Sequence, residues 1–131
     1  MSAAALKYIT VDGCTLQFQN GGSGTITPDP NQTSTKVKAG GKAVYKTLSF
    51  SISGYTGQAI TVAGSGSGSG QIKASSKKVK VEGNKVILEG DVSASITING
   101  LQPAEGGGTK PATATEVVKV MAAGQTKVKG A

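Results

Sequence analysis

The chain holds few side chains that could carry out acid–base or nucleophilic chemistry. It has no histidine and one cysteine, so an imidazole base is absent and Cys14 has no imidazole to activate its thiol. Glu82, Glu89 and Asp91 could form a carboxylate pair for glycoside cleavage, but they lie beside predicted turns, which favour such residues for conformational reasons. We therefore expect no catalytic residues, and we expect Cys14 to be an ordinary, partly buried cysteine.

The glycine-rich segments could be taken for phosphate-binding loops. Gly40-Gly41-Lys42-Ala43 has the glycines and the lysine of such a loop, but it lacks the following Ser or Thr, and a predicted strand, not a helix, comes next. A β-turn is the better interpretation. We expect no cofactor-binding residues and no small-molecule substrate.

The basic charge comes entirely from lysine. The chain carries 14 Lys, no Arg and seven acidic residues, for a net charge of +7, and only Lys77 and Lys78 are adjacent. Without Arg, the bidentate contact to guanine that dominates base recognition is unavailable, and three Tyr and two Phe are few for stacking bases. We expect a solvated basic face and no nucleic-acid partner. The alternative is a small basic β module that binds acidic glycans or anionic surfaces.

Length and composition predict one all-β domain over residues 1–131. Val and Ile together number 20 against five Leu, and 14 Thr add to this β-branched content, which suits a pleated sheet. Val, Ile, Leu and Phe make up only about a fifth of the chain, so the core must be thin, and a partner surface would help to stabilise it. The start of the chain lacks the pattern of a signal peptide, and a single cysteine fits a reducing compartment, so we expect synthesis in the cytoplasm.

Several segments have a readable local pattern. Leu6–Phe18 predicts a strand, a turn at Asp12-Gly13 and a second strand. Gln19–Thr35 predicts a loop or an irregular edge because it is rich in Gly, Thr, Asn and Pro. Gly64–Gly70 alternates Gly and Ser and predicts a flexible loop. Residues 109–131 form a C-terminal extension that we expect to end in a last hairpin, and a short helix over 112–123 is the alternative.

Two lysine-rich hairpins repeat along the chain. Lys36–Tyr45 and Lys78–Ile87, placed beneath each other, are identical at five of ten positions. Each reads as two short strands joined at a glycine, so Gly41 and Gly83 are the predicted turn residues. The match indicates an internal repeat.

A weaker third copy of this pattern is Ser95–Leu101, which alternates strictly and contains Asn-Gly, so Gly100 is a third predicted turn residue. The hydrophobic residues of the three copies are the predicted core: Val37, Val44, Val79, Val81, Val86, Ile96 and Ile98. Short hairpins of similar size imply an all-β stack, cone or pyramid.

These hairpins resemble a known family. Lys78–Asp91 is similar to the repeated hairpin of PAAR and PAAR-like proteins, and Thr35–Ser49 resembles it too. Ser95–Gly106 is similar to the Ile-Asn-Gly-x-Pro-Ala-Ala-Arg segment of that family, with one inserted residue and with Glu105 where the pattern continues Ala-Arg. The resemblance covers roughly residues 35–108.

The resemblance implies a structural role at the tip of a contractile injection system or phage tail. It implies a small β cone whose base caps a trimeric spike, one cap per trimer, and whose apex meets the target cell envelope. Some family members hold zinc with His and Cys side chains. Because tetrahedral zinc needs about four ligands and Cys14 is the only candidate here, we expect no metal ligands.

Overall fold

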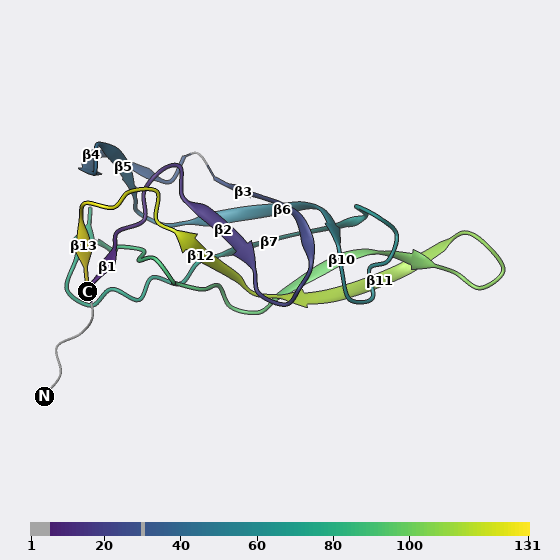
Figure 1. The fold of residues 1–131 in the computed structure, drawn as a ribbon. Coiled ribbons are helices and arrows are strands. Elements are labelled where there is room, and N and C mark those ends of the chain that lie inside the picture. Colours follow the sequence, from purple (N-terminus) through teal and green to yellow (C-terminus); the bar gives the residue numbers. More distant parts are fainter. Residues whose placement is uncertain (1–5, 30) are drawn as a thin grey trace, which may run out of the picture.

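The protein is built from β-strands throughout the part of the chain that the structure describes. The structure is a computed structural model, and it describes residues 6–29 and 31–131, so most of the segment read for a signal peptide lies outside it. Every regular element in these ranges is a strand, which confirms the predicted all-β class with short antiparallel sheets and hairpins. None of the described residues forms a long apolar helix that could cross a membrane. Figure 1 shows an elongated molecule that narrows from a broad end, where strands β1, β4, β5 and β13 lie, to the loop between β10 and β11.

One antiparallel sheet of five strands forms the body of the molecule. Its order is β11-β10-β7-β6-β3, so β3 and β11 are the edge strands. The strands are β3 (Ser23–Pro28), β6 (Ser49–Thr56), β7 (Gly66–Gln71), β10 (Ile96–Pro103) and β11 (Thr109–Glu116).

The other strands form four two-stranded sheets. Two are hairpins between consecutive strands, β4 (Thr33–Ala39) with β5 (Lys42–Tyr45) and β8 (Lys80–Val81) with β9 (Asn84–Lys85). Two join the beginning of the described chain to its end, β1 (Lys7–Tyr8) with β13 (Lys129–Gly130) and β2 (Thr15–Phe18) with β12 (Val118–Ala122). The fold therefore depends on pairings between segments far apart in sequence.

The hydrophobic side chains separate into two clusters. The larger lies between the five-stranded sheet and the β2–β12 pair, where Ile98, Val118 and Tyr55 are fully buried. The smaller lies beneath the two hairpins and contains Ile9, Val11, Ala39, Val44, Val81, Val86 and Leu88. The larger cluster contains fourteen buried residues of the described chain and the smaller contains seven.

Strand β7 corrects the prediction of a flexible Gly/Ser loop over 64–70. Gly66–Gln71 pairs with β6 and β10, and its glycines face the core while its serines face solvent. A Cβ at Gly70 would lie 2.6 Å from Cδ1 of Ile96, and one at Gly66 would lie 2.8 Å from Cβ of Tyr55. Glycine is needed because large side chains of other strands fill the space that its own side chain would take.

Gly100 is not a turn residue, which corrects a second prediction. It lies inside β10, where a Cβ would meet Cγ2 of Ile60 at 2.6 Å, so close packing and not turn geometry requires glycine. The chain turns later, where Ala104 N donates to Gly108 O and Gly107 N donates to Ala104 O. The Ser95–Leu101 pattern is thus one long strand and not a third hairpin.

Both ends of the described chain also differ from the local expectation. The predicted turn at Gly13 exists, but β1 and β2 on either side of it pair with β13 and β12, not with each other. Segment 19–35, predicted as a loop or an irregular edge, contains the irregular edge strand β3 and the start of β4. Residues 109–131 form three strands that pair with β10, β2 and β1, so this segment is neither a last hairpin nor a helix. Long-range pairing overrides local pattern for β1, β2 and residues 109–131.

The predicted core residues fall into three groups. Most are buried: Val44, Val81, Val86, Ile96 and Ile98. Val79 is partly buried and packs against the smaller cluster. Val37 is 39% exposed on β4 and does not belong to the core, because Ser34 and Ala39 are the residues of that strand which face inward.

Candidate functional site

The two lysine-rich hairpins have the same strand register. In the first, Lys38 is opposite Ala43 and Ala39 is opposite Lys42. In the second, Lys80 is opposite Lys85 and Val81 is opposite Asn84, which are the aligned positions of the repeat in every case. The sequence repeat is therefore also a structural repeat.

The two turns are also equivalent. Gly40 and Gly41 have φ of +60° and +83°, and Glu82 and Gly83 have φ of +48° and +83°. Positive φ at both central residues is the mark of a type I′ turn, which matches the twist of a hairpin. Gly41 and Gly83 thus lie at the turns, as expected from the sequence.

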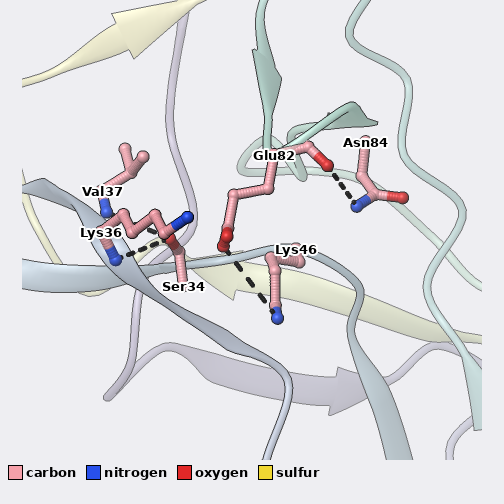
Figure 2. Close-up of polar contacts among 6 residues, drawn as sticks. All are labelled: Ser34, Lys36, Val37, Lys46, Glu82 and Asn84. Carbon is pink, nitrogen blue, oxygen red and sulfur yellow. Dashed lines mark hydrogen bonds and ion pairs between the residues drawn. The ribbon is translucent and has the colours of Figure 1, made fainter.

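A pair of buried serines extends the repeat beyond the segment visible in the sequence comparison. Ser34 Oγ accepts hydrogen bonds of 3.0 Å from the backbone N–H groups of Lys36 and Val37 (Figure 2). Ser76 Oγ, at the equivalent place before the second hairpin, accepts one of 3.2 Å from Val79 N. In both copies, a serine precedes the first repeated valine by the same number of residues. This spacing is visible in the sequence and could have extended the predicted repeat.

An ion pair joins the second hairpin to the residue that follows the first. Lys46 Nζ lies 4.0 Å from Oε2 of Glu82, and Figure 2 shows the two side chains pointing toward each other. Both are partly exposed, so this pair adds at most about 1 kcal/mol. The shared hydrophobic cluster is what holds the two hairpins together.

The other carboxylates that were candidates for a catalytic pair accept hydrogen bonds from backbone N–H groups. Asp91 is buried and accepts hydrogen bonds from Leu88 N at 2.8 Å and from the Ser75 backbone and hydroxyl. Glu89 Oε2 accepts one from Ala123 N at 3.1 Å. Together with Glu82 they are separate structural contacts, not a facing pair. Among residues 6–29 and 31–131, no three His, Cys, Asp or Glu side chains gather where they could hold a metal ion.

A fully buried carboxylate that the sequence did not single out fixes the loop after β2. Glu116 accepts hydrogen bonds from Asn20 N at 2.8 Å, from Gly22 N at 3.0 Å and from Tyr55 Oη at 2.5 Å. Burial, together with the bond to Glu116 and its negative charge, raises the pKa of Tyr55. This arrangement locks a loop to the sheet.

Cys14 and Tyr45 lie in a low-polarity environment. Burial, with a contribution from the charge of Asp12, raises the pKa of the Cys14 thiol to about 11. Burial likewise raises the pKa of Tyr45 to about 12. A thiol with a raised pKa is a poor nucleophile at neutral pH, so Cys14 has a packing role.

A groove beside the second hairpin has a basic rim and an apolar floor. Its volume is about 540 Å³. Lys46, Lys73 and Lys85 lie on the rim, and Ile72 and Ile87 contribute to the floor. This groove is where an acidic ligand with an apolar part would find complementary chemistry.

Comparisons with known proteins leave the geometry as the basis for function. No protein-family model matches this chain, and no curated protein or solved structure matches it either.

Proposed function

We propose that the protein is a non-enzymatic, PAAR-like cap on the blunt end of a trimeric spike. In this role one copy sits on each spike trimer of a contractile injection system or phage tail and helps the particle to penetrate the target envelope. The protein would be made in the cytoplasm and would act at the tip of the assembled particle.

The observation that carries this proposal is the repeated hairpin. The segment that resembles the family, Lys78–Asp91, contains β8 and β9, and its earlier copy, Thr35–Ser49, contains most of β4 and all of β5. The two copies share register, turn geometry and one buried cluster. A unit repeated in this way gives a small end piece whose two hairpins pack on the same hydrophobic cluster.

The roles of the polar residues favour a structural function. The described carboxylates that are buried, Asp91 and Glu116, bind backbone N–H groups, and the Cys14 thiol has a raised pKa. A spike that ends in unpaired strand edges needs a cover, because such edges attract other chains. Docking would also stabilise a protein with two small cores by mass action.

Co-expression with candidate trimeric spike proteins from the same genome tests the proposal. Native mass spectrometry of the affinity-purified complex should give one copy of this chain per trimer. The complex should persist when the salt concentration is raised from about 0.1 M to 0.5 M, because its interface would not depend on exposed charges. Failure to bind any of these spikes would overturn the cap.

A second candidate function, recognition of an acidic glycan, is favoured by the groove rimmed by Lys46, Lys73 and Lys85. Replacing these three lysines by Ala should then abolish binding to polygalacturonate. A matched control replaces Lys36, Lys38 and Lys110, which lie outside the groove, and keeps the same net charge as the first variant. Equal loss in both variants would indicate only a diffuse attraction to positive charge.

A further inference from the structure

A groove lies between β2 and edge strand β3, and the backbone edges of both strands are open there. Its volume is about 470 Å³, and its lining residues are Leu16, Gln17, Phe18, Gly21, Gly22, Ser23, Gly24 and Ile26. Among the described residues, no charged side chain lines it, although the chain carries 14 lysines. The lining of this groove combines polypeptide backbone, the uncharged polar side chains of Gln17 and Ser23, and the partly buried apolar side chains of Leu16, Phe18 and Ile26.

The register of the β2–β12 pair shows which backbone groups of β2 have no partner strand among residues 6–29 and 31–131. Gln19 N donates to Val117 O, so alternate residues of β2, including Gln17, bond to β12. The N–H and C=O groups of Leu16 and Phe18 therefore point away from β12, and both residues line the groove. Their partners in register, Val118 and Val120, accordingly bond to residues 90–93 and not to β2.

The β3–β6 pair gives the same result for β3. Asp29 N donates to Ser49 O, so the alternate residue Thr27 is also hydrogen bonded to β6. The N–H and C=O groups of Ile26 and the C=O group of Pro28, which has no N–H, point away from β6. Ile52, opposite Ile26, pairs with Gly68 of β7 on its other side. Ile26 therefore presents an N–H and a C=O on the edge that borders the groove.

The groove is held in shape before any partner arrives. Glu116 fixes the backbone of Asn20 and that of Gly22, which lines the groove. The ring of Phe18 packs edge-to-face on Tyr55, with 5.1 Å between centroids. A preformed site loses little conformational entropy on binding.

The opposite edge of the same sheet is closed to an added strand. Gln58 uses its side-chain amide to accept from Thr115 N at 3.1 Å and to donate to Thr115 O at 2.6 Å. Asn20 also donates to Thr115 O, and Pro111 has no N–H to offer. Edge strands are commonly blocked in these ways to prevent pairing with other chains. On β3, Pro28 likewise has no N–H to offer, so the open stretch of that edge is the one around Ile26.

We propose that the β2–β3 groove accepts an extended, uncharged segment of a partner protein, which adds as a β-strand. The free groups of Leu16, Phe18 and Ile26 would pair with its backbone, and Leu16, Phe18 and Ile26 side chains would contact its alternate residues. In the complex proposed above, this occupant is a terminal strand of the spike. The strand-accepting property itself follows from the groove and does not depend on the spike.

Amide hydrogen exchange on the complex with the spike, together with proline variants, tests the inference. The amides of residues 16, 18 and 26 should become protected, and Ile26→Pro should weaken binding by about tenfold or more through a lost donor and a steric block. The matched control is Thr113→Pro, since Thr113 N–H points outward from the other edge, as Thr115 N–H does. A second variant, Gln17→Lys with Ser23→Lys, places charge in the groove without changing the backbone, and it should weaken binding too.

The outcomes separate this inference from the cap. If the spike binds but these amides exchange as in the free protein, or Ile26→Pro binds as tightly as Thr113→Pro, the groove is not the docking site and the cap still stands. If no spike binds, the cap fails, and a soluble peptide of about eight alternating Thr and Val residues becomes the probe. Protection of the same amides by that peptide would support the inference, and its absence would overturn it.

Discussion

The hydroxyl of Tyr55 donates a 2.5 Å hydrogen bond to Glu116, 61 residues further along the chain. This bond completes the set of donors around a fully buried carboxylate, whose other two partners are backbone N–H groups of the loop after β2. It links β6, β11 and that loop in one place. The stability of the whole sheet edge should depend on it.

Tyr55→Phe should lower the free energy of unfolding by about 1–3 kcal/mol, because a buried carboxylate loses one donor while its shape complementarity is kept. Urea unfolding followed by circular dichroism measures this. Tyr8→Phe is the control, since its ring keeps the contact with Lys129 and its hydroxyl forms no hydrogen bond within the described ranges. Equal stability of the two variants would show that Glu116 does not need the Tyr55 hydroxyl.

Stability should fall as the pH rises above about 9 and more steeply above about 10, where cysteine and then tyrosine ordinarily lose their protons. The folded state raises the pKa of Cys14 to about 11 and that of Tyr45 to about 12, and it raises that of Tyr55 as well, so the folded protein keeps protons that the unfolded chain releases. The resulting stabilisation is complete below the unfolded pKa and is lost as the pH approaches the folded values. Urea midpoints between about pH 8 and 11 measure the loss, and Tyr55→Phe should reduce the slope. A flat profile would contradict the burial of both hydroxyls.

Cys14 should react slowly with iodoacetamide in the folded protein. With a pKa of about 11, its thiolate is scarce at pH 8, and the rate should be roughly a hundredfold below that of the urea-unfolded chain. Mass spectrometry at timed intervals measures both rates. Similar rates in the two states would mean that the thiol is exposed and activated.

Gly40→Ala should destabilise the protein more than Gly41→Ala, although both glycines have positive φ. At Gly41 a Cβ meets open space, so the cost is about 1 kcal/mol of backbone strain. At Gly40 a Cβ would also lie 2.7 Å from Cβ of Gln125, which adds about 1–3 kcal/mol of overpacking. Glu82→Ala is the control, because this equivalent position already holds a side chain at φ +48°. Thermal unfolding should give the lowest Tm for Gly40→Ala, a higher Tm for Gly41→Ala and the highest for Glu82→Ala.

The sequence predicted correctly those parts of the fold whose structure is determined by residues close together in the chain. The hairpins around Gly41 and Gly83 could be recognised because turn chemistry and alternation lie together in one short segment. Strand β7 could not, because its glycines are explained only by Phe50, Tyr55 and Ile96 on other strands. Gly and Ser alternate in β7 with the period of two that is typical of a strand. The buried face of such a strand normally carries apolar side chains, but in β7 it carries glycines, and side chains of other strands fill the space.

The same limit applies to the site. The pairing of β2 with β12, which leaves the edge at Leu16 and Phe18 free, joins segments near opposite ends of the chain and is set by burial of Val118 and Val120. Glu116 gave no signal, since a single acid at the end of a Thr-rich strand looks solvent exposed. Only the assembled fold shows that it is surrounded by donors.

The pairing of β1 with β13 gives the molecule an uneven response to mechanical load. Figure 1 shows both strands at the broad end, beside the last residue of the chain, while β6, β10 and β11 run along the long axis. Pulling on residues 6 and 131 would peel open a very short strand pair, one hydrogen bond after another. Thrust applied between the broad end and the β10–β11 loop would instead load many interstrand bonds sideways and together, since these bonds lie perpendicular to the strands. A body of this kind gives way easily to tension at its ends and resists a push along its length.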